Sequence, residues 1–340
     1  MKLHIFIIIS IFIYCLYPLG TKAQAVIVGF YNCENFYDTT NQANVVDEDF
    51  LPTSDKKYTS LAYDLKSQKI ARVIYELGTL AKSDGIALMG LVEIENKLVL
   101  NKLINEPILK KYHLKFIHFD SKDARGVDVA LVYNPAKFTP YQYLPFSLTN
   151  EQHFNNYATR DILFVKGLLQ NKWVYILVNH WPSRRGGAKA SQQKRIWAST
   201  VCKHIMDSIK VVDSLAHIIV MGDFNDNPSN KSLKMLQMAN PFLKLYKNGV
   251  GSIAYNDSWQ LFDQILLSSQ WQAKSGVSRP ELNLTNYKSI VYRNMDMIEL
   301  EGKYRGYPKR TYNGNVYRGG YSDHFPVALI FTQKMTENPQ

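Results

Sequence analysis

Five short runs of polar residues have the composition of a catalytic site, and each adjoins an apolar run of the kind that forms a buried strand. They contain carboxylate, amide and imidazole side chains, which bind hard cations and transfer protons. Four runs follow an apolar stretch and the fifth precedes one: Asn32-Cys33-Glu34-Asn35, Glu93-Ile94-Glu95-Asn96, Asn179-His180-Trp181-Pro182-Ser183, Gly222-Asp223-Phe224-Asn225-Asp226-Asn227-Pro228 and Tyr321-Ser322-Asp323-His324. We expect the strands to bring these runs to one edge of the fold.

The donor types in these runs indicate the chemistry. Oxygen atoms from Asp, Glu and Asn predominate, cysteine is nearly absent and histidine is scarce, so the set suits Mg²⁺, Mn²⁺ or Ca²⁺ and disfavours zinc. Hydrolysis of a phosphodiester requires a metal at a non-bridging oxygen, a base for water and donors that hold the phosphate. The polar runs contain all three kinds of group.

His180 and His324 are the candidate acid–base groups among the eight histidines. A histidine considered alone is more often an ordinary surface or core residue than a catalytic one. Both of these lie inside the polar runs, and that position favours a catalytic role for each.

The elements that would position the runs are mostly strands. Short apolar segments rich in β-branched residues predict nine of them: 26–31, 85–92, 114–119, 127–133, 162–169, 174–178, 217–221, 262–267 and 326–331. Apolar residues at helical spacing predict helices over 63–80 and 188–215. The polar segment 41–57 predicts an exposed loop. The pattern is mixed α/β with enough strands for two sheets.

The N-terminus resembles an export signal. Lys2 precedes an apolar run from Ile5 to Leu19, and a small-x-small sequence ends at Ala25, so residues 1–25 are predicted to be a signal peptide. A membrane anchor is the alternative, but the run is shorter than the roughly 20 residues that a spanning helix needs. Cys15 lies within the apolar run, where lipid attachment is not expected. We predict a secreted or periplasmic protein with one domain over residues 26–340.

The charge balance and the number of cysteines restrict the possible partners and the possible kind of scaffold. Lys and Arg number 40 against 29 Asp and Glu, a formal charge of +11, which falls to +9 once Lys2 and Lys22 are removed. A cationic protein suits a polyanionic partner, although basicity can also serve solubility alone. Only Cys33 and Cys202 remain after processing, which excludes a disulfide-rich scaffold and leaves one bridge possible.

The polar strings, taken in order, resemble the endonuclease/exonuclease/phosphatase superfamily. Gly222-Asp223-Phe224-Asn225 and Ser322-Asp323-His324 are the most specific of them, and the similarity extends from Asn32 to His324. The resemblance implies a deoxyribonuclease I-like fold, a four-layer α/β sandwich in which two packed mixed β-sheets are flanked by helices. It also implies hydrolysis of phosphoester bonds with a divalent metal.

The resemblance also implies a metal site and a catalytic base. Glu93 would be the principal metal ligand, Asn32 beside it would contact metal or phosphate, and Asp323 would complete the metal shell through water. His324 would activate the attacking water, and Asp263, in Phe262-Asp263-Gln264-Ile265, would hold the tautomer of His324.

The remaining implied roles concern the phosphate. Asp223 and Asn225 would orient water and phosphate, and His180 would donate to the phosphoryl oxygens or the leaving group. Arg160, in Thr159-Arg160-Asp161-Ile162, matches a position where some family members place a phosphate-contacting arginine.

Four further acids near these strings are ambiguous, because each could bind a second metal or face solvent: Glu34, Glu95, Asp128 and Asp226. We favour solvent-facing or loop-bracing roles for Glu95 and Asp226. Asp128 resembles a strand acid of the secreted bacterial branch of this superfamily and could buttress the site. Cys33-Glu34-Asn35 replaces a glycine-containing turn, which leaves the ligand set around Asn32 open.

Two basic segments could contact substrate. Arg184 and Arg185 follow His180 and could meet phosphates that flank the scissile one, although a solvated basic face is the alternative. The aromatic and basic segment 304–312, with Tyr317 and Arg318 beyond it, precedes the Ser-Asp-His string and is expected to border the substrate groove.

Three functions remain open. The first is a nuclease that cleaves DNA, and RNA as a further possibility, with little sequence preference. The second is a phosphodiesterase or phosphatase that acts on phospholipid head groups or small phosphoesters. A lipid enzyme is expected to have an exposed apolar hairpin or an aromatic loop tip for membrane contact, and the sequence shows no clear one. The third is a nucleic-acid-binding protein on the same fold without catalysis. No stable protein partner or membrane span after residue 25 is expected, and a monomer is the default.

Overall fold

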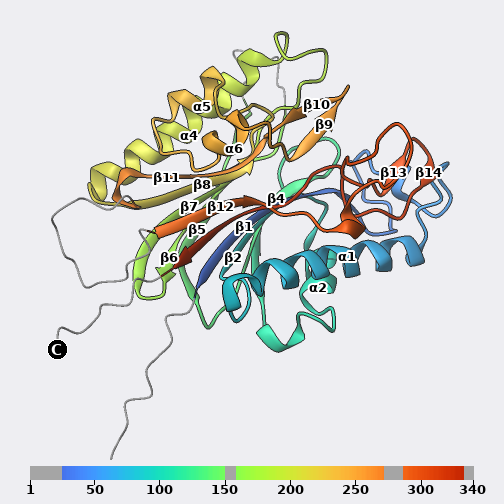
Figure 1. Cartoon of the computed structure of the whole chain (residues 1–340), viewed down its shortest axis with the longest axis horizontal. Coiled ribbons are helices and arrows are strands. Elements are labelled where there is room, and N and C mark those ends of the chain that lie inside the picture. Colours follow the sequence, from blue (N-terminus) through green and yellow to red (C-terminus); the bar gives the residue numbers. More distant parts are fainter. Residues whose placement is uncertain (1–24, 150–157, 272–285, 333–340) are drawn as a thin grey trace, which may run out of the picture.

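The computed structural model describes residues 25–149, 158–271 and 286–332. Two β-sheets are stacked face to face, with α1 and α2 on one outer side and α4 and α5 on the other (Figure 1). The fold is therefore the four-layer α/β sandwich that the resemblance implies.

The first sheet has six strands. Their spatial order is β12 (Asn286–Val291), β15 (Val327–Thr332), β1 (Val26–Phe36), β2 (Leu88–Ile94), β4 (Asp128–Tyr133) and β3 (Lys115–His118). β1 and β2 are parallel and the other neighbours are antiparallel. The central strands are buried on both faces, which explains why they appear as continuous apolar runs.

The second sheet has five strands. Their spatial order is β11 (Asp263–Leu267), β8 (His217–Asp223), β7 (Lys172–His180), β6 (Ile162–Leu169) and β5 (Phe138–Phe146). β7 and β8 are parallel, and the remaining pairs are antiparallel. Each sheet thus contains one parallel pair, and the two strands of such a pair end at the same edge.

Three apolar cores hold the layers together. The middle core joins the sheets, with Phe30 and Val92 from one and Ile176 and Met221 from the other. A second core lies between the six-stranded sheet and the helices α1 (Ser60–Gly78) and α2 (Lys97–Ile104). The third lies between the five-stranded sheet and α4 (Gln192–Val212) with α5 (Lys231–Met235).

The smaller elements lie in the connections. They comprise one short helix, α6 (Leu243–Lys247), and two hairpins: β9 (Ile253–Tyr255) with β10 (Ser258–Gln260), and β13 (Tyr312–Asn313) with β14 (Val316–Tyr317). Short 3-10 turns lie at Glu48–Phe50, Leu80–Lys82, Lys110–Tyr112, Ser269–Trp271 and Met295–Met297. Both hairpins project at the same end of the sandwich (Figure 1).

All nine predicted strands are present, with ends shifted by a few residues. The sequence pattern did not reveal β5 and β12, which are edge strands. β5 contains Pro140 and Pro145 and is largely exposed. Its sequence therefore lacks the continuous, proline-free apolar run by which the other strands were predicted. The predicted helices begin and end a few residues away from α1 and α4, and Thr59 caps α1 by accepting from Ala62 N.

The loop prediction for 41–57 is right in outline but not in full exposure. Asp47 is buried, and the Phe50 ring stacks on Tyr37 with centroids 4.2 Å apart. These contacts fix the segment against the end of β1.

The possible bridge between Cys33 and Cys202 is not formed. Both thiols are free and buried. Cys33 belongs to the core under α1 and Cys202 to the core under α4, so two β-sheets separate them. The two side chains act as small apolar core residues.

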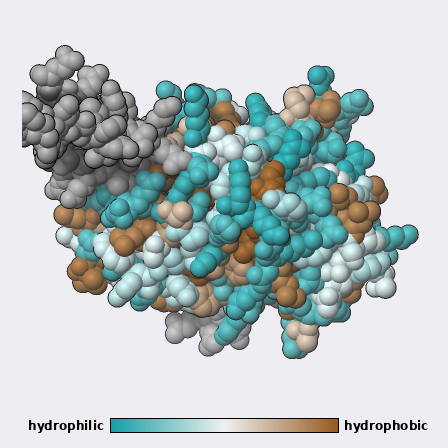
Figure 2. Space-filling view, turned by 90° about the horizontal axis from the view of Figure 1, so that it is seen from below, coloured by the Kyte–Doolittle hydropathy of each residue, from teal (hydrophilic) through white to brown (hydrophobic). Residues whose placement is uncertain are grey.

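The described surface is that of a polar protein with scattered apolar groups. Hydrophilic side chains cover most of the face in Figure 2, and hydrophobic ones form small patches between them. Among the described residues, no helix is both long and apolar enough to span a membrane. The predicted signal peptide, residues 1–25, lies outside the described residues except for Ala25.

Candidate active site

The ends of both parallel strand pairs meet at one edge of the sandwich. Asn32 lies on β1, Glu93 on β2, His180 at the end of β7 and Asp223 at the end of β8. His180 is the register partner of Asp223, and Asp263, the first residue of β11, is the partner of Asp223 on its other side. The topology thus brings side chains far apart in the sequence into one cluster.

Asn32 links the two sheets. Its Nδ2 donates to Glu93 Oε1 at 3.3 Å and to Asp223 Oδ2 at 3.1 Å, while its Oδ1 accepts from Glu34 N at 2.9 Å. All three contacts agree on the orientation of the amide. Asn32 therefore holds two carboxylates in place with its nitrogen, and its oxygen is engaged by the backbone.

The backbone at these strand ends adopts a conformation that non-glycine residues rarely take. Glu93 has φ of 60°, Asn35 has 56° and Asn225 has 50°. Glu93 is further fixed because its Oε2 accepts from Asn35 N at 2.8 Å. Left-handed backbone at non-glycine residues costs energy and clusters at functional sites.

His324 and Asp263 form a close pair. His324 Nδ1 lies 2.7 Å from Asp263 Oδ2, and the Ser252 hydroxyl donates to the same carboxylate oxygen. Burial opposes the charged imidazole, but the neighbouring carboxylates Asp263, Asp223 and Asp323 raise the pKa of His324 well above its ordinary value. The pairing directs Nε2 into the cluster, 3.9 Å from Asp223 Oδ2.

Asp223 is a buried acid of the cluster, and its pKa lies near neutrality. Burial raises the pKa of Asp223 to about 7 and Asp263 adds to the rise, while His324 and the hydrogen bonds from Asn225 N and Asn32 oppose it. A cation bound nearby would stabilise the charged form of this buried carboxylate and lower its pKa.

His180 differs from His324 in its charge state. Burial lowers the pKa of His180 well below its ordinary value, and the cations Arg160, Arg125 and His324 lower it further. Its Nε2 lies 3.7 Å from Asp223 Oδ2 and 3.9 Å from Glu93 Oε1. The site thus pairs a neutral imidazole with a strongly basic one, an arrangement that separates acid–base roles.

Asp323 lies at the rim of the cluster. Its Oδ1 is 3.9 Å from His324 Nε2, and its Oδ2 accepts from Arg310 at 2.8 Å. Arg310 also donates to Glu34 Oε1 at 2.8 Å, and the buried Lys66 ammonium lies 3.9 Å from Glu34 Oε2. Glu34 is therefore enclosed between two cations and braces the β1 end.

Asn225, Asp226 and Arg184 form a separate network beside the cluster. Asn225 Nδ2 donates to the Trp181 carbonyl at 3.0 Å, and its own carbonyl accepts from Arg184 Nε at 2.8 Å. Asp226 pairs with Arg184 at 3.1 Å and with Arg195 at 2.9 Å. Asp226 braces the loop as expected, and Arg184 is engaged by this loop.

Arg160 is close to the cluster but already paired. Its guanidinium lies 3.0 Å from Asp123 Oδ2 and donates to the Trp181 carbonyl at 2.7 Å, and the residue is 2 % exposed. Arg125, two residues after Asp123, is exposed. Partial burial lowers the pKa of Arg125, but the neighbouring carboxylates of Asp123 and then Glu93 raise it above its ordinary value. Arg185 is exposed on the loop after β7.

The donor set suits a hard divalent cation. Carboxylates of Glu93, Asp223 and Asp323 surround the imidazoles, and one ligand atom each of Asp223, Asp263 and His324 lie within 4.8 Å of one another. Asp263 Oδ1 is buried without a hydrogen-bond partner among the described residues. Oxygen-rich sites of this kind are typical of Mg²⁺ and Mn²⁺.

Several residues of the site had no clear signal in the sequence. Ser252, which orients Asp263, lies in a loop before β9, and Arg125 lies in the turn before β4. Ser322 was part of a recognised string without a role; its hydroxyl donates to the Asn32 carbonyl at 2.7 Å and accepts from His324 N. Long-range contacts of this type become visible only in the folded chain.

Glu95 braces the end of β2 rather than joining the cluster. It accepts from Asp38 N and from Gln42 Nε2, the latter at 3.0 Å, and burial raises its pKa from 4.5 to about 8. The folded chain therefore keeps the proton that the unfolded chain releases above pH 4.5. Stability from this group is full below pH 4.5 and is lost as the pH rises to about 8.

Replacing Glu95 with glutamine is expected to flatten this pH dependence. The free energy of unfolding of the wild type should fall by roughly 1–3 kcal/mol more than that of Glu95→Gln between these limits, after allowance for partial exposure. Urea unfolding at several pH values measures it, with the exposed Glu48→Gln as control. Equal slopes in all three proteins would contradict the assignment.

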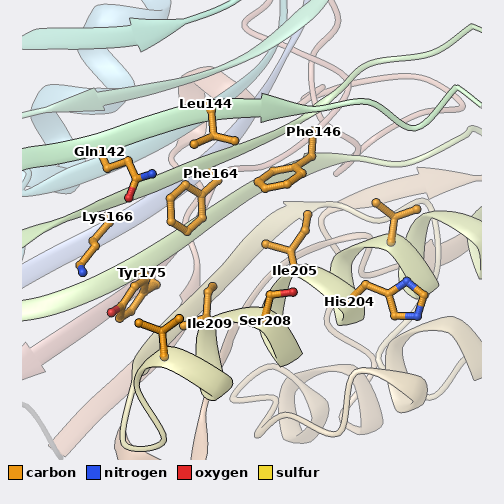
Figure 3. A pocket seen from close by; sticks show the side chains of 12 residues that line it. Gln142, Leu144, Phe146, Phe164, Lys166, Tyr175, His204, Ile205, Ser208 and Ile209 are labelled. Atoms are coloured by element: carbon orange, nitrogen blue, oxygen red, sulfur yellow. The ribbon is translucent and has the colours of Figure 1, made fainter.

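A mainly apolar cavity lies elsewhere. It has a volume of about 470 Å³ between α4 and the strands β5, β6 and β7, and its walls include Leu144, Phe164, Tyr175 and Ile205 (Figure 3). None of its lining residues belongs to the cluster and none is acidic. The hydrolytic chemistry is therefore assigned to the strand ends.

Solved structures share this fold at low sequence identity. An endonuclease/exonuclease/phosphatase family protein of Bacteroides thetaiotaomicron has a TM-score of 0.53 and 15% identity, and the match covers 93% of this chain and 100% of the other. Truncated Caenorhabditis elegans TDP2 has a TM-score of 0.54 and 13% identity, with 91% and 97% covered. A B. thetaiotaomicron mannosyl-6-phosphatase has a TM-score of 0.52 and 15% identity, with 89% and 98% covered.

No curated protein matches the sequence. A sequence profile described as the Endonuclease/Exonuclease/phosphatase family matches residues 27–334, nearly the whole described chain. The chain therefore belongs to the endonuclease/exonuclease/phosphatase family, and this membership assigns it to the hydrolases that act on phosphoester bonds.

Proposed function

We propose that this chain is an exported, divalent-metal-dependent phosphodiesterase and that its substrate is DNA, with RNA as a further substrate. The observation that supports hydrolysis most strongly is the His324–Asp263 pair at 2.7 Å, whose free nitrogen faces the same cluster as Glu93 and Asp223. A base, a cation site and a polar phosphate site then occupy one buried edge.

In this proposal each residue of the cluster has a distinct catalytic role. Glu93 would hold the metal, with Asp323 completing its surroundings through water, and Asn32 keeps Glu93 and Asp223 in register. A bound divalent cation would neutralise charge on a non-bridging phosphate oxygen. In its neutral form, which a bound cation would favour by lowering the pKa of the imidazole, His324 takes the proton of the attacking water, and Asp263 stabilises the imidazolium that results.

The phosphate itself would be held by neutral and cationic donors. His180, kept neutral by burial and nearby cations, donates a hydrogen bond without adding charge. Asp223 and Asn225 orient water and phosphate. Arg160 is buried against Asp123, and Arg184 is held by Asp226. Arg125 and Arg310 also pair with acids, but their side chains are 44% and 53% exposed, so we assign first contact with the substrate to them and to the exposed Arg185.

A groove next to the site favours a nucleic acid. A cavity of about 140 Å³ adjoins Glu34 and Asn35. Two cations and three aromatic rings contribute to its walls: Lys56, Arg310, Phe50, Tyr58 and Tyr312. The cations suit flanking phosphates, whereas Tyr58 and Tyr312 are buried and serve mainly to shape the wall. The formal charge of +11 supports the same class of substrate.

A lipid head group is the second candidate, and the hairpin β9–β10 favours it. Tyr255 near its tip is 72% exposed, and Trp259 and Tyr307 pack together at its side. The hairpin follows Ser252, which contacts the catalytic Asp263, so its base adjoins the site. This hairpin is the feature that the sequence did not reveal. A binding protein without catalysis ranks last, because every group needed for hydrolysis is present.

The substrate class is tested by incubating the purified chain with plasmid DNA, RNA, sphingomyelin vesicles and an activated bis-phosphodiester, with Mg²⁺ or with EDTA. We expect nicking of the plasmid in Mg²⁺ and none in EDTA. Turnover of sphingomyelin alone would replace the nuclease by the lipid enzyme. DNA binding without any turnover would leave only the non-catalytic protein. Export is tested separately, by N-terminal sequencing of the mature protein, which should begin at residue 26.

A further inference from the structure

His118 is buried without a partner for either ring nitrogen. Its side chain is 0% exposed, and both Nδ1 and Nε2 lack a hydrogen bond. Each buried polar atom left in this state costs about 1–3 kcal/mol. His118 is the last residue of β3 and takes no part in the hydrolytic cluster described above.

Two acids face this imidazole. Asp128, the first residue of β4, has a carboxylate oxygen 3.4 Å from Nε2, yet the geometry is not that of a hydrogen bond. Asp120 has an oxygen 3.8 Å from Nδ1. One ring nitrogen and one oxygen of each acid lie within 4.8 Å of one another. Ligands of one metal ion surround it without hydrogen-bonding to one another, and these three side chains are arranged in that way.

There is room for an ion beside Asp120 and Asp128, although His118 does not line that space. A cavity of about 160 Å³ is lined by Asp120, Asp128, Asp123 and Glu95, with Lys122 as its cation. On the other side of Asp128, a small cavity of about 10 Å³ adjoins Asp161, whose Oδ1 is also buried without a partner. Asp123 is paired with Arg160 and Arg125, and burial keeps Glu95 protonated up to about pH 8, so Asp120 and Asp128 supply the negative charge of this cavity against Lys122.

We propose that His118, Asp120 and Asp128 bind a divalent transition-metal ion of the Zn²⁺ class. One imidazole with two carboxylates is a donor set that Zn²⁺ accepts, whereas Mg²⁺ favours oxygen ligands and water. The ion would satisfy one ring nitrogen of the buried imidazole and would offset the charge of Asp120 and Asp128. No residue of this set belongs to the strand-end cluster.

The ion would fix a loop that reaches the hydrolytic site. Its ligands lie at both ends of the segment 118–128, and Ser121 N already donates to Asp128 Oδ1 at 2.8 Å. The same segment supplies Asp123, the partner of Arg160, and Arg125, which lies near Glu93. Fixing this loop would hold Asp123 against Arg160 and keep Arg125 near Glu93, so the ion would have a positioning role.

The test uses the full chain, stripped with EDTA and then dialysed against Zn²⁺ with a large excess of Mg²⁺. Metal is counted by atomic emission, and the melting temperature is recorded with and without Zn²⁺. We expect the wild type to bind one equivalent of Zn²⁺ more than Asp120→Asn, whose affinity should be at least about tenfold weaker. Binding to the folded state should also raise the melting temperature of the wild type alone.

Matched variants separate this ion from the hydrolytic metal. Glu93→Gln should retain the Asp120-dependent equivalent, and the exposed His113→Gln should behave as wild type, whereas His118→Gln should lose it. Asp120 is 77% exposed in its side chain, so Asp120→Asn is expected to fold even if His118→Gln does not. Equal Zn²⁺ binding by wild type and Asp120→Asn, or loss of the equivalent in Glu93→Gln, would overturn the proposal without affecting the hydrolytic assignment.

Discussion

Replacing His324 with alanine is expected to lower kcat by about 10²- to 10⁴-fold with little change in KM, because the variant loses the base that accepts the water proton. His324 is the one imidazole of the cluster that is paired through Nδ1 with a buried carboxylate, at 2.7 Å from Asp263. The measurement is steady-state hydrolysis of an activated bis-phosphodiester in excess Mg²⁺.

The matched control for this prediction is His113→Ala, an exposed histidine in a turn, which should leave kcat unchanged. Circular dichroism and the melting temperature must show that His324→Ala is folded. The kcat of Asp263→Asn should lie between those of His324→Ala and His113→Ala, since the imidazole of His324 remains but its orientation and charge are no longer supported. A folded His324→Ala protein with wild-type kcat would remove His324 from the mechanism.

Replacing Glu93 with glutamine is expected to weaken Mg²⁺ binding by well over about tenfold and to abolish most activity. Glutamine keeps the size of the side chain and one oxygen that can accept from Asn35 N, so the loss would reflect the missing charge. Calorimetric titration with Mg²⁺ measures the affinity directly.

Glu95→Gln is the control for Glu93→Gln, because Glu95 lies two residues further along and accepts from Asp38 N and Gln42 instead of facing the cluster. Its Mg²⁺ affinity should stay within about twofold of wild type. Equal losses in both variants would mean that the principal metal ligand had been assigned to the wrong acid.

Much of the fold follows from local pattern. Buried central strands such as β8 appear as apolar runs, and their polar ends mark the site because parallel strands end together. β5 and β12 lack that pattern because β5 is largely exposed and the described side chains of β12 are at most partly buried, whereas the edge strands β3 and β11 keep buried apolar residues and were predicted. Sequence periodicity does not record such strands.

The site was predictable in its residues but not in its contacts. Asn32, Glu93, His180, Asp223, Asp263 and His324 do converge. The sequence did not show that Asn32 turns its nitrogen toward the acids, or that Arg160 is paired with Asp123. These outcomes depend on which charges become neighbours after folding, and no local spacing specifies that.

The central claim is that strand ends from both sheets act as a single hydrolytic centre. The direct test is a double-mutant cycle on kcat/KM with Glu93→Gln, His324→Ala and the double variant, all in excess Mg²⁺. If the groups act as one unit, the double variant should be about as slow as the slower single variant. Losses that multiply fully would show independent contributions and would contradict a shared centre.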